Sequence, residues 1–288
     1  MSPPLPYKLL AIDIDGTLVN SRDELTPKVR DALRAAAAAG LKLVLATGRR
    51  YSRALPLVEP LGIDAPIVSA SGALIKCPLS HRTLHVASLD REHLRATLDV
   101  TVARGHDAVL YADTYDRGFD YYFRGYDNIC PELKQYYDLN EGCGLAVPDL
   151  YANPPDGVFA GFAMGSRADM LALDEALQRE VPERLYTHVI RSPRYQGFMC
   201  EIAPAGATKW SGVRFVADEW GIADEEIIAV GDDVNDLPML AGSGLGIAMG
   251  NAVVELKDAA DHIAPHHDDD GLAEVVRWIL QAELPPAR

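Results

Sequence analysis

The stretch KLLAIDIDGTLVNS, residues 8–21, decides the fold of this chain. It is an apolar run that carries two aspartates, Asp13 and Asp15, directly before a Gly-Thr turn. Such a run is typical of a buried strand in a parallel sheet, where carboxylates are costly unless they are paired, hydrogen-bonded or bound to a metal. Residues i and i+2 of a strand share a face. We therefore expect Asp13 and Asp15 to lie side by side and to need a cation.

The size and charge of the chain limit its class. With 288 residues it can form one large domain or two of ordinary size, and its 48% of apolar residues can build a core. The net charge of −15 argues against nucleic acid, which needs a basic face, and against an anionic membrane. We expect neither as a partner, and we interpret the acidity as a contribution to solubility.

Targeting and redox signals point to a cytoplasmic protein. No targeting segment is recognised, and no run approaches the ~18 apolar residues that a membrane span needs. The cysteines are scattered without a Cys-x-x-Cys pair, so we expect reduced thiols and neither a disulfide framework nor a zinc site. They are Cys77, Cys130, Cys143 and Cys200.

Strand and helix patterns alternate in the first part of the chain. The segment at 25–40 has Thr26 as an N-cap, Pro27 at the first helical position and Gly40 as a stop. Strands are expected at 41–47 and 65–75, with a helix at about 51–61 between them. This alternation predicts a parallel α/β sheet with right-handed crossovers.

The amino-acid composition changes near residue 84, after which tyrosines and turn residues become frequent. Helices at 88–105 and 166–180 and half-polar strands at 107–116 and 157–164 predict an inserted α+β module. The α/β pattern resumes after FMCEIAPAG, residues 198–206. We predict the α/β core at 1–83 and 196–288, with the α+β insertion at 84–195.

Four polar pieces fall at the carboxyl ends of predicted parallel strands or at a helix start, which is the sheet edge that binds ligands in open α/β folds. They are DIDGT (13–17), ATGR (46–49), ATKW (207–210) and GDDVND (231–236). Their oxygens suit Mg²⁺, a lysine and a hydroxyl suit phosphoryl oxygens, and an aspartate beside a metal can attack phosphorus. Each piece alone has an ordinary interpretation, such as a turn cap or a solvated helix lysine, but their joint order and placement favour a site.

In this order, the four pieces resemble the motifs of the haloacid dehalogenase (HAD) superfamily. The stretches APAGATKW, GIAMGNA and ADHIAPHHDDDGLAEVV resemble its Cof-type subgroup, which carries a type IIB cap. The resemblance covers nearly the whole chain. It implies a Rossmann-like parallel-sheet core with an α+β cap domain inserted after the third strand.

The resemblance also implies roles for individual residues. Asp13 would be the nucleophile, and Asp15 would act as acid and then as base. Mg²⁺ would be held by Asp13, the Asp15 backbone carbonyl and Asp232. The phosphoryl oxygens would be held by Thr47, Gly48, Lys209 and Asn235, with Asp236, Gly16, Arg49 and Ser71 in supporting places. Ser71 departs from the subgroup, which usually has an asparagine there: a serine keeps a hydroxyl but lacks the reach of the amide.

Other polar groups have two interpretations each. The HHDDD run at 266–270 is either a second metal site or, as we expect, a solvated loop before the last helix. The tyrosines of the insertion either line a substrate pocket or pack in its core. The same alternatives apply to the arginines Arg117, Arg124, Arg191 and Arg194.

Three functions are compatible with these signals. The first is a Mg²⁺-dependent phosphatase that hydrolyses small phosphorylated metabolites, such as sugar phosphates or phosphorylated cofactors, through an aspartyl phosphate. The second is a hexose phosphomutase of the same superfamily, which would need a second anion site in the cap. The third, a non-enzymatic phospho-aspartate signalling module, is disfavoured by the two acids on one strand and by the large insertion. The sequence predicts no oligomeric state.

Overall fold

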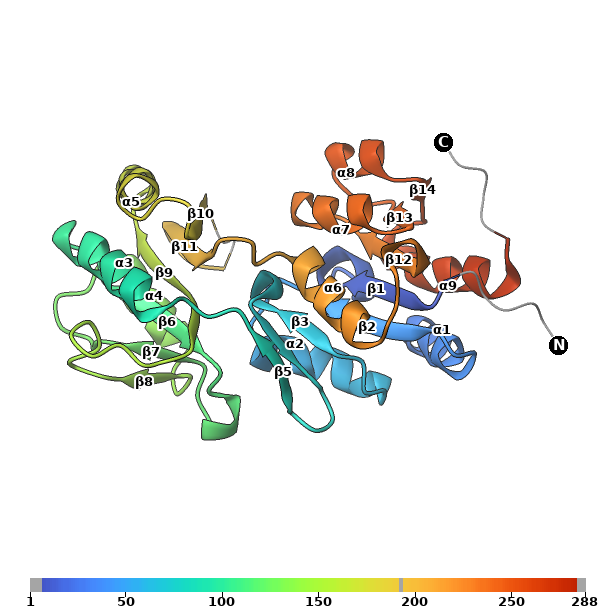
Figure 1. Ribbon diagram of the computed structural model, residues 1–288, viewed down its shortest axis with the longest axis horizontal. Helices are drawn as coiled ribbons and strands as arrows, with labels where there is room; N and C mark the ends of the chain where they lie inside the picture. The colour runs from blue at the N-terminus through green and yellow to red at the C-terminus, as the bar shows by residue number, and fades with distance from the viewer. Residues whose placement is uncertain (1–6, 192–193, 284–288) are drawn as a thin grey trace. The chain divides into compact units, whose positions relative to one another are not determined.

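Strand β1 (Leu9–Asp13) forms from the apolar run at the start of the chain and lies in the interior of a sheet (Figure 1). The structure is a computed structural model that describes residues 7–191 and 194–283. Within the described residues the sheet has eight strands in the order β14-β13-β12-β1-β2-β3-β4-β5. All five residues of β1 are buried, so both faces of this strand are covered, as its unbroken apolar pattern predicts.

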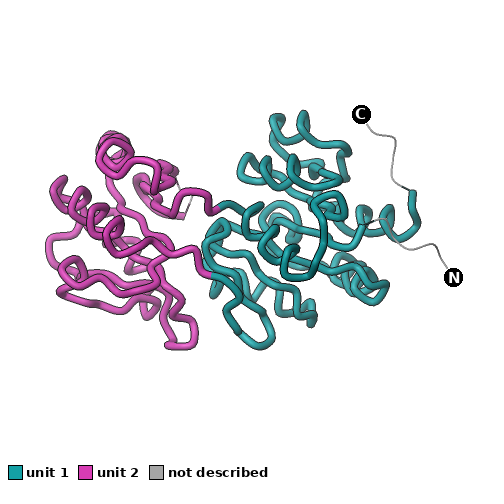
Figure 2. The backbone as a smooth tube through the Cα atoms, in the orientation of Figure 1, with its two compact units in different colours: residues 1–85, 208–288 teal, residues 86–207 magenta. Residues whose placement is uncertain are grey.

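The chain divides into two compact units (Figure 2). Unit 1 takes in the described residues up to His85 and from Thr208 onward, and unit 2 spans Val86–Ala207. The return to unit 1 is at Thr208, whereas the sequence placed it at residue 196. The reason is β11 (Phe198–Pro204), which pairs with β9 and β10 and so completes the sheet of unit 2.

Unit 1 is built from strands and helices that mostly alternate along the chain. Its strands are β1, β2 (Lys42–Ala46), β3 (Ile67–Ser69), β4 (Leu74–Lys76), β5 (Thr83–Val86, whose last residue belongs to unit 2), β12 (Ile227–Gly231), β13 (Leu245–Ala248) and β14 (His262–Ile263). Its α-helices are α1 (Pro27–Ala38), α2 (Tyr51–Val58), α6 (Lys209–Glu219), α7 (Leu237–Gly242), α8 (Val254–Ala259) and α9 (Gly271–Gln281). The pairs β14-β13, β13-β12, β12-β1, β1-β2 and β2-β3 are parallel. This confirms the predicted α/β core, while β4 turns back antiparallel to β3.

Helices cover both faces of this sheet. Leu9 and Ala11 of β1 join a buried cluster with residues of α6, α7 and α8. Leu10 and Ile12 alternate with them along the strand, point to the opposite face and are also fully buried. Helices α1 and α9 pack against each other, and α1 contacts β2, the neighbour of β1. With its faces covered, the sheet leaves the carboxyl ends of its parallel strands open, and polar side chains can converge there.

Local sequence signals predict several helix ends correctly. The Thr26 hydroxyl accepts a hydrogen bond from the Val29 amide at 3.2 Å, Pro27 opens α1, and Gly40 lies beyond its end with a φ of +97°. Helix α2 ends at Val58 and is followed by a 3₁₀ turn up to Leu61. Helix α1 begins where its capping residue predicts, because a cap satisfies backbone groups locally.

Unit 2 is an α+β module with its own sheet. Within the described residues this sheet has six strands in the order β10-β11-β9-β6-β7-β8. They are β6 (Ala108–Ala112), β7 (Tyr121–Phe123), β8 (Gly144–Ala146), β9 (Val158–Gly165), β10 (Leu185–Ile190) and β11. Helices α3 (Arg91–Ala103), α4 (Pro131–Leu139) and α5 (Arg167–Glu180) pack around it. The expected helices at 88–105 and 166–180 are thus present as α3 and α5.

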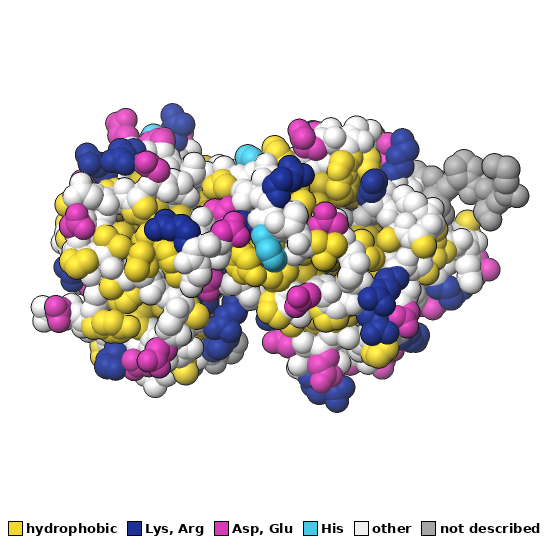
Figure 3. All heavy atoms as spheres, turned by 90° about the horizontal axis from the view of Figure 1, so that it is seen from below, with side chains coloured by type: hydrophobic (Ala, Val, Ile, Leu, Met, Phe, Trp, Pro, Cys, Tyr) yellow, Lys and Arg dark blue, Asp and Glu magenta, His cyan; other side chains and the backbone are white. Residues whose placement is uncertain are grey.

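The visible surface is of mixed charge. On the face drawn in Figure 3, acidic and basic side chains are interspersed over each unit, with apolar side chains between them. Among the helices of residues 7–191 and 194–283, none combines the length and the hydropathy that crossing a membrane requires.

Candidate active site

Asp13 ends β1 with its carboxylate inside unit 1. Its side chain is 2% exposed, and Oδ1 accepts a hydrogen bond from Lys209 Nζ at 2.6 Å. Oδ2 is buried and has no hydrogen-bond partner among the described residues. A buried carboxylate oxygen without a donor is costly, so this atom is available for a bond that the protein itself does not supply.

Asp15 lies in a more exposed environment than Asp13. Strand β1 ends at Asp13, and the backbone kinks at Asp15 and Gly16, so the alternation of the strand does not extend to Asp15. The Asp15 side chain is 49% exposed and accepts hydrogen bonds from Arg49 Nε at 2.8 Å and Thr47 Oγ1 at 3.3 Å. Arg49 also bonds to Asp23 at 2.8 Å.

Lys209 is the first residue of α6, and the start of that helix is tightly built. Thr208 and Ser211 form a capping box, with Ser211 N donating to Thr208 Oγ1 at 3.0 Å. Gly72 packs directly against this turn: it has a φ of +105°, and a Cβ there would lie 2.0 Å from the Thr208 carbonyl oxygen. Only glycine fits, so the loop after β3 can approach the helix start.

The Lys209 ammonium binds three oxygens from distant parts of the chain. Besides Asp13, Nζ donates to Asn235 Oδ1 at 3.0 Å and to Asp236 Oδ1 at 2.8 Å. The side chain is only 4% exposed. All three donors of the ammonium are therefore used, and Lys209 is not the solvated helix lysine of the ordinary interpretation.

The GDDVND turn after β12 is held by Asp236. Its Oδ2 accepts from the backbone amides of Asp232 and Asp233 at 3.0 and 3.2 Å, while Oδ1 faces Lys209. Asp233 caps the following turn through Val234 N at 2.7 Å. Asp236 thus orients Lys209 directly, and Asp232 is left pointing into the site.

The electrostatics of the site are dominated by carboxylates. Burial and the neighbouring Asp236 raise the pKa of Asp13, against the opposing effect of Lys209. Burial, Asp236 and Asp233 raise the pKa of Asp232 to about 6. Burial lowers the pKa of Lys209, but Asp13 and Asp236 outweigh it and raise the value overall. Lys209 stays charged, and the carboxylates around it carry more negative charge than it neutralises.

These residues fit a divalent cation. Single carboxylate oxygens of Asp13, Asp232 and Asp236 lie within 4.8 Å of one another. A Cβ at Gly16, whose φ is +72°, would come within 2.1 Å of Asp232 Oδ2, so only glycine leaves room for that carboxylate. Oxygen ligands with an excess of negative charge are what Mg²⁺ prefers. The Asp13 side chain belongs to this group and also carries a buried oxygen, Oδ2, without a hydrogen-bond partner among the described residues.

The loops after β2 and β3 meet at Ser71. The Ser71 amide donates to the Thr47 carbonyl at 3.0 Å, and Ala70 N donates to the Arg49 carbonyl at 2.9 Å. A Cβ at Gly48 would meet only Ser71 Oγ, at 3.5 Å, which is an ordinary contact. Ser71 has a φ of +54°, a left-handed conformation in which asparagine is common.

Sequence reasoning missed Asn251, which follows β13. Its Nδ2 donates to the Gly16 carbonyl at 2.8 Å and to Asp232 Oδ2 at 3.2 Å. The only signal was its place in GIAMGNA. That stretch supported the resemblance to the subgroup but assigned no role to any of its residues. The HHDDD run is also more than a solvated loop: His267 is 12% exposed on its side chain and binds the Val19 carbonyl through Nδ1 at 2.8 Å.

In unit 2, five of the singled-out side chains serve the unit's own packing. The rings of Tyr121, Tyr136 and Tyr137 are buried in one aromatic cluster. Arg117 Nη1 donates to the Tyr122 hydroxyl at 2.6 Å, and Arg124 forms an ion pair with Asp107 at 2.9 Å. These contacts favour the packing interpretation for these five side chains.

Comparison with known proteins identifies the family. The model of the haloacid dehalogenase-like hydrolases matches residues 10–276. Phosphatase YwpJ of Bacillus subtilis (strain 168) is 28% identical over 299 residues, covering 95% of this chain and 100% of that protein. The 5-amino-6-(5-phospho-D-ribitylamino)uracil phosphatase YwtE of the same organism is 27% identical, covering 96% and 99%.

Solved structures agree with the sequence comparison. The crystal structure of a haloacid dehalogenase-like hydrolase from Bacteroides thetaiotaomicron superimposes with a TM-score of 0.77 at 28% identity, covering 95% of this chain and 99% of that one. The likeness extends over both units, so it includes the inserted module as well as the core. The chain belongs to the haloacid dehalogenase-like hydrolases, as its four motifs predict, and is an enzyme of that family.

Proposed function

We propose that this protein is a Mg²⁺-dependent phosphatase that hydrolyses small phosphorylated metabolites through an aspartyl phosphate on Asp13. The observation that carries the proposal is the state of the Asp13 carboxylate: one oxygen is bound by Lys209 at 2.6 Å, and the other is buried without a donor among the described residues. A buried carboxylate fixed in this way is a nucleophile that has already lost its water.

Asp13, the backbone carbonyl of Asp15 and Asp232 are the groups that would hold the metal ion. When bound, Mg²⁺ offsets the negative charge of the carboxylates and of the phosphoryl group. The Thr47 hydroxyl, the Gly48 amide, Lys209 and the Asn235 side chain then bind the phosphoryl oxygens. This assignment uses the groups at the carboxyl ends of β1, β2 and β12 and at the start of α6.

The reaction has two balanced steps. In the first, an Asp13 carboxylate oxygen forms a bond to phosphorus while the bond from phosphorus to the substrate oxygen breaks, and that oxygen takes a proton from Asp15. In the second, Asp15 takes a proton from water, the water oxygen bonds to phosphorus, and the bond to Asp13 breaks. The half-exposed Asp15 side chain, oriented by Arg49 and Thr47, suits this proton exchange better than the buried Asp13 does.

The substrate class follows from the relatives. YwtE is named as a phosphatase of a phosphorylated ribitylaminouracil, and YwpJ as a phosphatase. We therefore propose phosphate monoesters of small molecules, sugar phosphates and phosphorylated cofactors or their precursors, as substrates. A hexose phosphomutase would use the same Asp13 chemistry and is distinguished from a phosphatase by its product.

The test is phosphate release from a panel of phosphorylated sugars, nucleotides and cofactors, with Mg²⁺ and with a chelator. Asp13→Asn keeps the volume of the side chain but removes the nucleophile, so we expect turnover to fall by about a thousandfold or more. Asp258→Asn, the same change on the exposed face of α8, is the matched control and should leave turnover unchanged.

Other results would contradict parts of the proposal. Substantial turnover by Asp13→Asn would exclude the covalent intermediate, and release that persists with the chelator would exclude the metal dependence. An isomerised sugar phosphate without free phosphate would identify a mutase instead.

A further inference from the structure

The loop that carries Asp15 is hydrogen-bonded by the side chain of Asn251, a residue distant in sequence. Residues 14–19 form a closed turn, in which Val19 N donates to the Ile14 carbonyl at 3.1 Å. Asn251 Nδ2 donates to the Gly16 carbonyl at 2.8 Å and, on the other side, to Asp232 Oδ2 at 3.2 Å. One amino group thus joins the turn after β1 to the carboxylate after β12, and these segments are more than 200 residues apart in sequence.

The orientation of the Asn251 amide is fixed by its partners. Its Oδ1 accepts a hydrogen bond from the His267 backbone amide at 3.0 Å, and a backbone N–H can only donate. Its Nδ2 faces the Gly16 carbonyl, which can only accept. Both contacts require the same orientation, so a flipped amide would lose all three hydrogen bonds.

The segment that fixes Asn251 also holds the far end of the same loop. His267 Nδ1 lies 2.8 Å from the Val19 carbonyl oxygen, so Nδ1 carries the proton. Asp268 Oδ1 accepts from Ser21 N at 2.8 Å, and Asp270 Oδ1 accepts from the Thr26 hydroxyl at 2.6 Å. The run at 266–270 therefore binds the chain at Val19, Ser21 and Thr26, while the His267 backbone orients Asn251.

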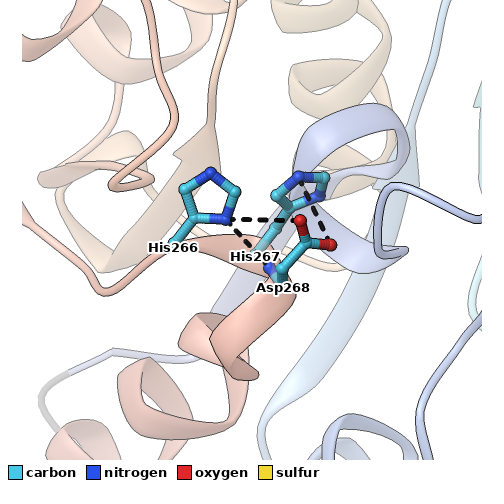
Figure 4. A group of neighbouring side chains, drawn as sticks. All are labelled: His266, His267 and Asp268. Carbon is cyan, nitrogen blue, oxygen red and sulfur yellow. Dashed lines mark hydrogen bonds and ion pairs between the residues drawn. The ribbon is translucent and has the colours of Figure 1, made fainter.

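These contacts argue against a second metal site at the same place. Figure 4 shows both imidazole rings beside the Asp268 carboxylate. However, His266 Nδ1 accepts from the Asp268 amide at 3.1 Å, so its proton is on Nε2 and neither ring nitrogen has a free lone pair for a metal. His267 Nε2 is thus left without a second imidazole ligand, and Asp268 Oδ1 is used by Ser21. The ring-to-carboxylate distances of 3.8 Å are too long for hydrogen bonds. The hydrogen bonds of residues 266–270 instead connect this run to neighbouring segments of the protein.

We propose that Asn251 is a positioning residue that sets the distance between the Asp15 backbone and the Asp232 carboxylate, and that His267 fixes it in that role. The inference rests on the proposed function, because both groups are proposed metal ligands. The Gly16 carbonyl follows the Asp15 carbonyl along the chain, so holding one constrains the other. Groups behind metal ligands orient them, and their loss typically lowers metal affinity or activity by about 10–100-fold.

The direct test is a calorimetric titration of the substrate-free protein with Mg²⁺. We expect Asn251→Ala to raise the Kd for Mg²⁺ by about tenfold or more, because the Asp15 turn and Asp232 lose their common donor. Asn153→Ala is the matched control: Asn153 is an exposed asparagine of unit 2 whose amide donates only to Asp149 within the described residues. It should leave the Kd unchanged.

Substitutions of His267 separate positioning from general stability. Asn places its Nδ2 the same number of bonds from Cα as the Nδ1 of histidine, so His267→Asn can still donate to the Val19 carbonyl and should keep the parent's Kd. Gln places its nitrogen one bond farther away, so His267→Gln should raise the Kd as Asn251→Ala does. If His267 only stabilised the fold, the Kd for Mg²⁺ would change in proportion to the thermal stability of each variant. If it positions Asn251, the Kd depends on whether the substituted side chain can still donate to the Val19 carbonyl.

The outcomes distinguish this inference from the proposed function. If the parent binds Mg²⁺ and releases phosphate but Asn251→Ala has the parent's Kd, positioning by Asn251 is wrong and the phosphatase stands. If Asn251→Ala does not fold, equal Kd values for His267→Asn and His267→Gln overturn the inference. A parent that neither binds Mg²⁺ nor releases phosphate overturns the proposed function, and the inference with it.

Discussion

At the scale of single residues, Lys209 shows how the site is specified. Its ammonium lies 2.6–3.0 Å from Asp13, Asn235 and Asp236 while almost fully buried. Removing the lysine would leave buried carboxylates without their counter-charge, which is far more costly than losing a surface ion pair. The same residue is thus needed for the shape of the site and for the proposed binding of phosphoryl oxygens.

Ser71 is a residue at which the chain is strained. It follows Ala70, and both have positive φ values, +54° and +47°. A left-handed conformation costs a residue other than glycine roughly 1–2 kcal/mol, and asparagine tolerates it best. We expect Ser71→Asn to stabilise unit 1 by on the order of 0.5 kcal/mol, part of that cost.

Tryptophan fluorescence during denaturant unfolding measures this effect selectively. The three tryptophans, Trp210, Trp220 and Trp278, all belong to unit 1. Ser80→Asn, the same change at an exposed serine without a positive φ, should give no gain. A loss of stability in Ser71→Asn would show that crowding near Thr47 outweighs the backbone preference.

At the scale of elements, the start of α1 is joined to the 266–270 run. The Thr26 hydroxyl accepts from Val29 N at 3.2 Å and donates to Asp270 Oδ1 at 2.6 Å. Thr26→Val keeps the shape of the side chain but removes both hydrogen bonds. We expect it to destabilise unit 1 by about 1–2 kcal/mol, the upper part of the range for losing a helix cap.

The measurement is the same fluorescence-detected unfolding, with Thr26→Ser as the control that retains the hydroxyl. Thr26→Ser should remain within about 0.5 kcal/mol of the parent. Equal destabilisation by both substitutions would mean that the methyl group, and not the hydroxyl, makes the contribution.

At the scale of the whole molecule, the site residues all belong to unit 1. A ligand that binds only the folded protein stabilises it by an amount that grows with its concentration, about 2.7 kcal/mol at 100 times its Kd. We therefore expect Mg²⁺ to slow hydrogen exchange in unit 1, most strongly at 13–19 and 231–236. The core of unit 2 around β9 and α5, which has its own buried cluster, should exchange at an unchanged rate.

Exchange monitored by mass spectrometry with Mg²⁺ and with chelator gives the result peptide by peptide. Asp232→Asn, which removes one proposed ligand, should reduce the Mg²⁺ effect strongly. Protection that is equal in the two units, or absent from 231–236, would contradict a metal site at the ends of β1 and β12.

The sequence by itself determined much of the local structure and which motif residues are candidates for the site. The apolar run before Asp13, the cap at Thr26 and the alternation of strands and helices depend on neighbours in the chain, so their periodicity and capping residues could be read directly. The motif residues could be placed at one sheet edge, because parallel strands bring their carboxyl ends together.

Only the tertiary structure decided how these residues are arranged. It buried Asp13 against Lys209 and left Asp15 half-exposed, because β1 ends between them and the Arg49 guanidinium binds the second carboxylate. It placed β11 in unit 2 and made Asn251 the link between Gly16 and Asp232. Partners of this kind are distant in sequence, and packing of the whole fold selects them, so no local pattern encodes them.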